Sequence, residues 1–130
     1  MIADTTFIID VMNGDHDAIQ KAKLLQRENS PISVTSVSIF ELYVGVGATN
    51  KREEEVVKIL DLIDGLPVHP LDEISSREAG IIYTHRKKQG KPIQSEDAMI
   101  AGICKFRNDP LLTRNVRHFA GIDGLLIERY

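Results

Sequence analysis

The chain has 130 residues, of which 42% are hydrophobic and 27% charged, with a formal net charge of −3 and one cysteine. This length suits a single domain over residues 1–130, able to bury about two thirds of its unfolded surface without a disulfide or metal staple. The charge excludes a generally basic nucleic-acid-binding surface, and no apolar stretch approaches the roughly 18 residues of a membrane span, so we expect neither export nor membrane insertion.

Short strand-like runs alternate with longer helical patterns along the chain. Strands are predicted at residues 1–3, 32–35, 66–69, 111–113 and 125–128. Apolar faces at helical spacing are predicted over residues 19–25, 39–46, 56–63 and 74–82, and a fifth helix runs from Ser95 to Phe106. Alternation of this kind predicts an α/β fold with a parallel sheet.

Asp4 directly follows the first predicted strand and precedes a run that continues apolar through Ile9. An ionised carboxylate beside such a run costs several kcal/mol, in order of magnitude, unless something pairs with it. The neighbouring Thr5 and Thr6 offer only local hydroxyl groups. We therefore expect Asp4 either to be satisfied locally or to bind a ligand.

Two further acids fall where the carboxyl ends of parallel strands gather ligands. Glu41 lies early in the helix after the second strand, and Asp97 lies in the first turn of the helix from Ser95. Each has a purely structural alternative: Ser38 and Glu41 match the S-x-x-E capping box, and Asp97 could simply complement a helix N-terminus. The sequence leaves both alternatives open.

Cys104 lies in an apolar run, which favours a buried, inert thiol over a reactive one. A free, unpaired cysteine fits the reducing environment of the cytoplasm. We therefore expect a cytoplasmic protein.

Four segments in order resemble the PIN-domain ribonucleases, and within them the VapC toxins of toxin–antitoxin pairs. The segments are residues 1–10 (MIADTTFIID), 36–42 (SVSIFEL), 92–101 (PIQSEDAMIA) and 112–119 (LTRNVRHF). The resemblance spans essentially the whole chain. It implies a three-layer α/β/α sandwich with a mostly parallel central sheet of about five strands.

The resemblance also implies the site residues. Asp4, Glu41 and Asp97 match the three principal metal-site acids of the family. The family's fourth acid is missing, because its two usual positions hold Asn115 and His118. We expect Asn115 to take its place as a catalytic neighbour and His118 to lie close by, toward RNA or solvent; supporting polar side chains are expected at Thr6 and Thr113.

Clustered carboxylates suit phosphodiester hydrolysis, since one or two hard divalent cations can activate water and neutralise charge on the phosphoryl oxygens. Mg²⁺ takes one or two carboxylates directly and keeps several waters, and Mn²⁺ would also fit. The resemblance therefore implies an Mg²⁺- or Mn²⁺-dependent ribonuclease that hydrolyses RNA.

Basic residues near these acids are candidates for RNA phosphate binding: Arg86, Lys87, Lys88, Lys91, Arg114 and Arg117. The alternative for the cluster around Arg86 is a solvated helix terminus that complements its dipole.

The resemblance further implies a cognate antitoxin and a homodimer. Apolar residues Tyr43, Val44 and Val46, with the helix over residues 56–63, either supply the surface for one of these partners or belong to the core.

Other functions remain as alternatives. With the fourth acid missing, the chain could be a catalytically inactive RNA-binding or regulatory protein, or else a solitary RNA-processing nuclease. A phosphatase or receiver domain lacks its second acid, because Thr6 occupies that position, and no glycine-rich phosphate-binding loop occurs.

Overall fold

The computed structural model describes all 130 residues, and its strands all pair in parallel. They are β1 (Ile2–Ala3), β2 (Val34–Thr35), β3 (Val68–His69), β4 (Leu111–Thr113) and β5 (Ile127–Arg129). Strand β4 lies between β1 and β5, while β2 pairs with β3. An isolated parallel bridge between Ile2 and Ser33 joins the two sets, which gives the spatial order β3-β2-β1-β4-β5.

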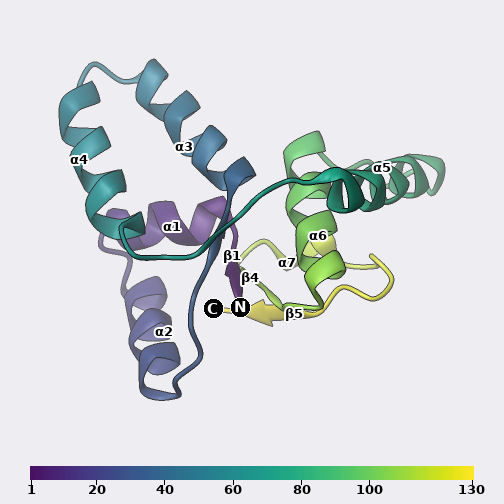
Figure 1. The fold of residues 1–130 in the computed structure, drawn as a ribbon, viewed down its shortest axis with the longest axis horizontal. Helices are drawn as coiled ribbons and strands as arrows, with labels where there is room; N and C mark the ends of the chain where they lie inside the picture. The colour runs from purple at the N-terminus through teal and green to yellow at the C-terminus, as the bar shows by residue number, and fades with distance from the viewer.

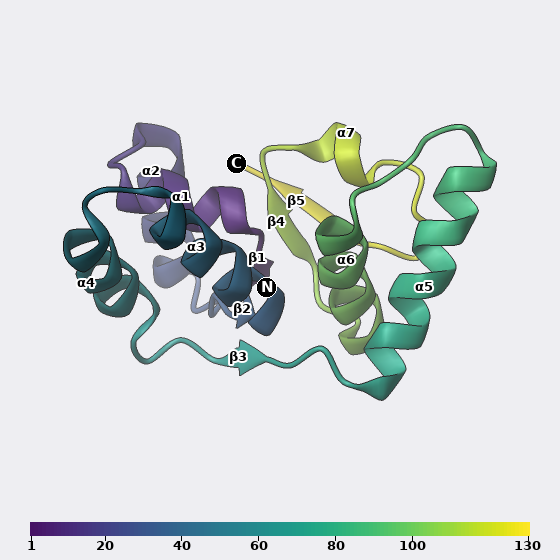
Figure 2. The ribbon, with the colours of Figure 1, turned by 90° about the horizontal axis from the view of Figure 1, so that it is seen from above.

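Helices cover the strands from both sides. They are α1 (Thr5–Met12), α2 (His16–Arg27), α3 (Ser36–Ala48), α4 (Arg52–Ile63), α5 (Glu73–Lys88), α6 (Ser95–Arg107) and α7 (Val116–Phe119). Figures 1 and 2 show α1 to α4 on one side of β1, β4 and β5, and α5 and α6 on the other. The expected sandwich of helices around a parallel sheet is confirmed.

The two faces of the sheet bury separate hydrophobic cores. Side chains of a strand point alternately to opposite faces, and the central strands follow this rule: Ile2 and Leu111 belong to the core beneath α5 and α6, whereas Ala3 and Leu112 belong to the core beneath α1 and α2. All four residues are fully buried. Strands buried on both faces explain why these segments read as continuous apolar runs.

The parallel pairing brings polar residues from distant segments to one edge. Ala3 is in register with Leu112, and Thr113 with Arg129. The residues that follow the strands, Asp4, Arg114 and Tyr130, therefore lie at the same carboxyl edge of the sheet. Ligands of open α/β sheets bind at this edge.

Close packing of α6 on α5 fixes the helix that carries Asp97. A Cβ atom at Gly102 would lie 2.7 Å from the Ser75 carbonyl oxygen and 2.8 Å from the Ala79 amide nitrogen. Only glycine allows this approach without a backbone shift. At the other end of α5, Gly90 has a φ of +70° just beyond the helix, a conformation that favours glycine.

Two short helices, α1 and α7, were not predicted. The apolar run from Thr5 to Ile9 is the start of α1, because Asp4 caps a helix there rather than extending β1. Helix α7 has four residues, too few to show a helical period. The predicted burial of Cys104 is confirmed, and burial raises the pKa of its thiol. None of the helices combines the length and the apolar composition that crossing a membrane requires.

Candidate functional site

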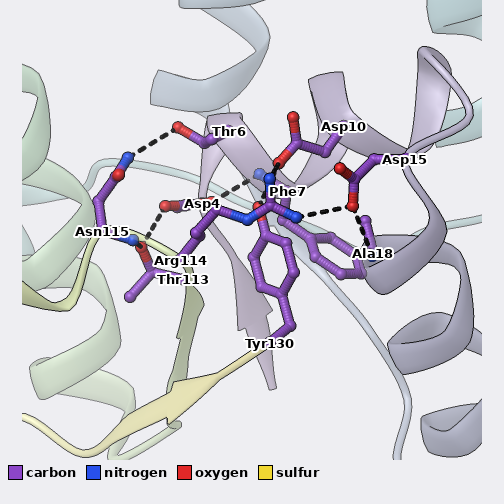
Figure 3. Close-up of polar contacts among 10 residues, drawn as sticks. All are labelled: Asp4, Thr6, Phe7, Asp10, Asp15, Ala18, Thr113, Arg114, Asn115 and Tyr130. Carbon is purple, nitrogen blue, oxygen red and sulfur yellow. Dashed lines mark hydrogen bonds and ion pairs between the residues drawn. The ribbon is translucent and has the colours of Figure 1, made fainter.

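Asp4 is buried, with 4% of its surface exposed, and is held by two donors (Figure 3). It is the N-cap of α1, and its Oδ1 accepts a 2.7 Å hydrogen bond from the Phe7 amide. Its Oδ2 accepts a hydrogen bond from the Thr113 hydroxyl across the sheet edge. Asp4 is therefore satisfied partly by its own helix and partly by β4, and Thr5 and Thr6 do not bond it.

The electrostatics of Asp4 are dominated by burial. Desolvation raises the pKa of Asp4 from 3.8 to about 6, although the hydrogen bonds from Thr113 and Phe7 lower it. The negative charges of Asp97 and Asp10 raise it further. A carboxyl with a strongly raised pKa at the ligand-binding edge of a sheet is typical of a functional group.

The turn after β4 connects Asp4 to Asn115. Besides donating to Asp4, the Thr113 hydroxyl accepts a 2.9 Å hydrogen bond from the Asn115 amide. The side-chain Nδ2 of Asn115 donates to the Thr6 hydroxyl at 3.2 Å. The predicted residues Thr6, Thr113 and Asn115 therefore lie together with Asp4, and the side-chain oxygen of Asn115 has no protein partner.

Arg114 takes part in a network that sequence reasoning missed (Figure 3). Its Nη2 donates to Asp15 Oδ1 at 2.6 Å, and its Nη1 lies 3.2 Å from Asp10 Oδ2. The Tyr130 hydroxyl donates to the same Asp10 oxygen at 2.9 Å, and the Arg114 guanidinium lies 4.9 Å from the Tyr130 ring centroid. The hydrogen bond from Arg114 holds the pKa of Asp15 below its ordinary value.

The prediction that Arg114 binds RNA phosphate stays a prediction, and the network gives Arg114 a structural role as well. Its guanidinium is already occupied by two carboxylates and an aromatic face, so its role here is to tie the turn after β4 to α1 and α2. The helix-capping position of Asp15 was legible in the sequence, since an acid precedes the amphipathic pattern of α2. Nothing in the sequence pointed to Tyr130, which reaches Asp10 only through the pairing of β5 with β4.

Glu41 lies on α3 and faces α1. Its Oε1 accepts a 2.7 Å hydrogen bond from the Thr5 hydroxyl. The capping-box alternative is wrong, because the N-cap of α3 is Thr35, whose hydroxyl oxygen accepts from the Ser38 amide. Burial raises the pKa of Glu41, and the charge of Asp97 raises it further, whereas the Thr5 hydrogen bond lowers it.

Asp97 lies in the first turn of α6 and contacts α7. His118 Nδ1 lies 3.3 Å from Asp97 Oδ2, with side chains 59% and 24% exposed, respectively. Burial raises the pKa of Asp97, while the charge and hydrogen bond of His118 lower it. Of the two residues at the positions of the missing fourth acid, Asn115 contacts the Asp4 side and His118 contacts Asp97.

The three acids share one electrostatic neighbourhood, but they are not a preassembled metal site. The charge of Asp97 raises the pKa of both Asp4 and Glu41. No group of three His, Cys, Asp or Glu side chains is close enough together to hold a metal ion. In this structure each carboxylate is turned to a protein group, namely Thr113, Thr5 or His118. That Asp4, Glu41 and Asp97 hold a metal together stays a prediction.

The predicted RNA-binding cations differ in their surroundings. Lys87, Lys88 and Lys91 are exposed, as expected for a solvated helix terminus. Arg86 is not solvated: it is 5% exposed and donates to the backbone oxygens of Lys91 and Ala120. The helix-terminus alternative is therefore wrong for Arg86.

Comparison with known proteins identifies similar chains. Residues 1–125 match the family model of the PIN domain. Ribonuclease VapC3 of Methanocaldococcus jannaschii is 35% identical over 102 residues, which cover 78% of this chain and 95% of that protein. The tRNA(fMet)-specific endonuclease VapC of Salmonella typhimurium is 26% identical over 128 residues, which cover 98% of this chain and 95% of that protein.

Solved structures share the fold over nearly the whole chain. DNA-bound VapBC from Salmonella typhimurium aligns with a TM-score of 0.86 and 26% identity, covering 98% of this chain and 96% of that chain. VapBC2 from Rickettsia felis, bound to a DNA fragment from their promoter, aligns with a TM-score of 0.90. Its identity of 23%, over 99% of this chain and 97% of that chain, shows the fold alone.

Proposed function

The chain belongs to the PIN-domain family and, within it, to the VapC ribonucleases, and we propose that it is a metal-dependent endoribonuclease that serves as the toxin of a toxin–antitoxin pair. The observation that carries the proposal is that the charge of Asp97 raises the pKa of both Asp4 and Glu41, two acids near the carboxyl edge of the sheet. The proposal assigns this activity to one domain over residues 1–130, in the cytoplasm.

The donor set fits Mg²⁺ or Mn²⁺. Carboxylate and amide oxygens are the hard ligands that these ions prefer, and Mg²⁺ takes only one or two carboxylates directly and keeps several waters. A preassembled cluster of three acids is therefore not required. Asp4, Glu41 and Asp97 would hold the ion, which when bound supplies an activated water and neutralises charge on the phosphoryl oxygens.

The remaining side chains orient these acids. The Thr113 hydroxyl and the Phe7 amide fix both oxygens of Asp4, and because each donates to the carboxylate, both favour its ionised form. The Thr5 hydroxyl does the same for Glu41. The Nδ2 of Asn115 donates to the Thr6 hydroxyl, which leaves the side-chain carbonyl oxygen of Asn115 free to accept a hydrogen bond from a bound water.

An exposed apolar surface on α3 and α4 supports the proposed protein partner. Its members are Phe40, Tyr43 and Val44 on α3 and Val57 and Leu60 on α4, each between 42% and 58% exposed. These side chains lie outside the hydrophobic core, so the alternative that Tyr43 and Val44 are core residues is wrong. We assign this surface to the cognate antitoxin. We also propose that the protein forms a homodimer, which light scattering can test.

The activity is tested by incubating the purified protein with RNA and Mg²⁺ or Mn²⁺. Wild-type protein should cut RNA, EDTA should stop cleavage, and Asp97→Asn should abolish it. Asp17→Asn is the matched control, because Asp17 is also an acid in the first turn of a helix but is exposed on α2. RNA binding without cleavage would instead favour an inactive regulatory protein.

Metal binding has a readout independent of cleavage. The negative charges of these acids repel one another without a metal ion, so a divalent ion should raise the melting temperature of the wild type. Asp97→Asn should lose that rise and Asp17→Asn should keep it. Equal shifts in all three proteins would contradict metal binding by these acids. A short reading frame upstream for a DNA-binding protein would distinguish a toxin from a solitary RNA-processing nuclease.

A further inference from the structure

A polar hollow of about 240 Å³ lies beside Asp97. The last turn of α5 contributes Arg86, the segment before α6 contributes Gln94, and α7 contributes Arg117 and His118. Helix α7 packs against α6, which brings these segments together (Figure 2). We name this hollow the Arg86 pocket.

Arg86 is a buried cation without an acidic partner. Its Nε donates to the Lys91 carbonyl at 2.8 Å and its Nη1 to the Ala120 carbonyl at 2.6 Å, and no carboxylate lies within ion-pair distance. Its Nη2 has no partner in the protein. Since no fully buried side-chain nitrogen or oxygen lacks a hydrogen-bond partner, Nη2 keeps some exposed surface. A buried charge of this kind is costly unless an anion pairs with it.

The other charges of the Arg86 pocket leave an excess of donors. Arg117 is exposed and makes no ion pair within the protein. The one carboxylate that lines the pocket, Asp97, is already paired with His118. Arg86 and Arg117 therefore both line the pocket and neither pairs with a carboxylate, and the planar fork of arginine matches the geometry of a phosphate.

We propose that the Arg86 pocket is a phosphate subsite, which holds a phosphate of the RNA backbone adjacent to the linkage that is cut. This rests on the proposed function, because Asp97 belongs both to the pocket and to the acids of the proposed site. The subsite sets the position of the RNA relative to those acids. Buried Arg86 is the fixed element, and exposed Arg117 closes on the phosphate from α7. Lys87, Lys88 and Lys91 lie outside the pocket and attract RNA without fixing its position.

The test uses full-length Arg117→Ala and a single-stranded RNA that the wild type cuts. A hydrogen-bonded phosphate contact is worth roughly tenfold in affinity, so KM should rise about tenfold with little change in kcat. The slope of log Kd against log salt should fall by about one. Arg27→Ala is the matched control, because Arg27 is an exposed arginine in the last turn of α2, and it should change neither quantity.

A series of RNAs with one neutral methylphosphonate each locates the phosphate. In the wild type, one position next to the cut should weaken binding about tenfold, as one lost charged contact would. In Arg117→Ala, that position should lose most of its effect, while other positions keep theirs. Arg86→Lys keeps the charge but loses the planar fork of arginine. If urea unfolding confirms that this variant folds, the methylphosphonate at the same position should again lose most of its effect on binding.

The outcomes separate the two proposals. A wild type that neither binds nor cuts RNA overturns the proposed function and the subsite with it. If the wild type cuts RNA, two results overturn the subsite alone. One is an unchanged KM in Arg117→Ala, and the other is that the effects of Arg117→Ala and of the methylphosphonate on binding add at every phosphate position. If Arg117→Ala binds RNA as tightly as the wild type but binds the co-expressed antitoxin more weakly, the phosphate subsite is overturned. The occupant of the Arg86 pocket is then an acidic protein segment.

Discussion

The two sides of the proposed site are built differently. The closed side, defined by Asp4, Thr113, Asn115 and Arg114, is tied together by hydrogen bonds that run from α1 across the end of β4. Its acid is 4% exposed and has donors on both oxygens. The open side, defined by Glu41, Asp97 and His118, has one protein contact for each acid, and its Asp97 side chain is 24% exposed.

The difference shows which geometry folding sets and which it leaves to a ligand. On the closed side, the positions of the donors follow from strand pairing and from the cap of α1, so they are formed before any ligand arrives. On the open side, the contact of Asp97 with exposed His118 can rearrange at little cost, because ion pairs near the surface contribute only about 0 to 1 kcal/mol. A metal ion or RNA would therefore adjust Asp97 and Glu41 toward a fixed Asp4.

The largest expected effect is on the closed side, in Asp4→Asn. The pKa of Asp4 is about 6 in the folded protein and 3.8 ordinarily, so the folded state binds more protons between these values. The free energy of unfolding should therefore fall as pH rises from about 4 to 6, by about 3 kcal/mol in total, and stay lowered above pH 6. Asparagine caps a helix as well as aspartate does and carries no charge.

Urea unfolding in EDTA at several pH values measures this effect. Asp4→Asn should equal the wild type near pH 4 and exceed it above pH 6 by up to about 3 kcal/mol, while losing RNA cleavage. A wild-type stability that does not change between pH 4 and 6 would contradict the desolvation of Asp4.

Thr113→Val should have the next largest effect. It removes the hydroxyl that donates to Asp4 and accepts from the Asn115 amide, at a residue with no exposed surface. Leaving a buried carboxylate without this donor should cost about 2 kcal/mol and raise the pKa of Asp4 further. Thr113→Ser keeps the hydroxyl and is the control. The two variants should differ in urea midpoint and in the pH profile of cleavage; identical profiles would show that the Thr113 hydroxyl does not set the pKa of Asp4.

Tyr130→Phe should lose about 1 kcal/mol, the usual contribution of one hydrogen bond. It deletes the bond to Asp10 but keeps the edge-to-face contact with Phe7, whose ring centroid lies 4.8 Å away. Tyr83→Phe, at a tyrosine 42% exposed on α5, is the matched control and should be neutral in thermal unfolding. Equal stabilities of the two variants would remove Tyr130 from the Arg114 network.

The smallest stability effect is expected on the open side, in His118→Gln. The His118 side chain is 59% exposed, so unfolding stability should change by less than about 0.5 kcal/mol. The pKa of Asp97 should nevertheless rise, because His118 lowers it in the wild type. Titration of the Asp97 carboxyl carbon by NMR measures this shift, and His16→Gln, beside exposed Asp17, is the control. A change of 2 kcal/mol would show that the open side is as rigid as the closed side.

Part of this site was legible before the fold was known. Asp4 was conspicuous because a charge beside an apolar strand needs a partner. Glu41 followed from its place in the helix after the second strand, and Asp97 from its place in the first turn of the helix from Ser95. Thr113 and Asn115 were predicted from the resemblance alone, because nothing in their own segment shows that they contact Asp4. The partners Asp10 and Tyr130 were missed altogether, since they meet only when β5 pairs with β4.

The sequence by itself determined the order of the five strands and the five longer helices, the parallel sheet and the acids at its carboxyl edge, because apolar periodicity and helix-capping residues act over a few neighbouring positions. Only the tertiary structure decided which donor each acid receives, that Arg114 is occupied by Asp10 and Asp15, and that Arg86 is buried without a counter-charge. Those facts depend on residues far apart in sequence, whose contacts are set by strand register and helix packing rather than by local preference.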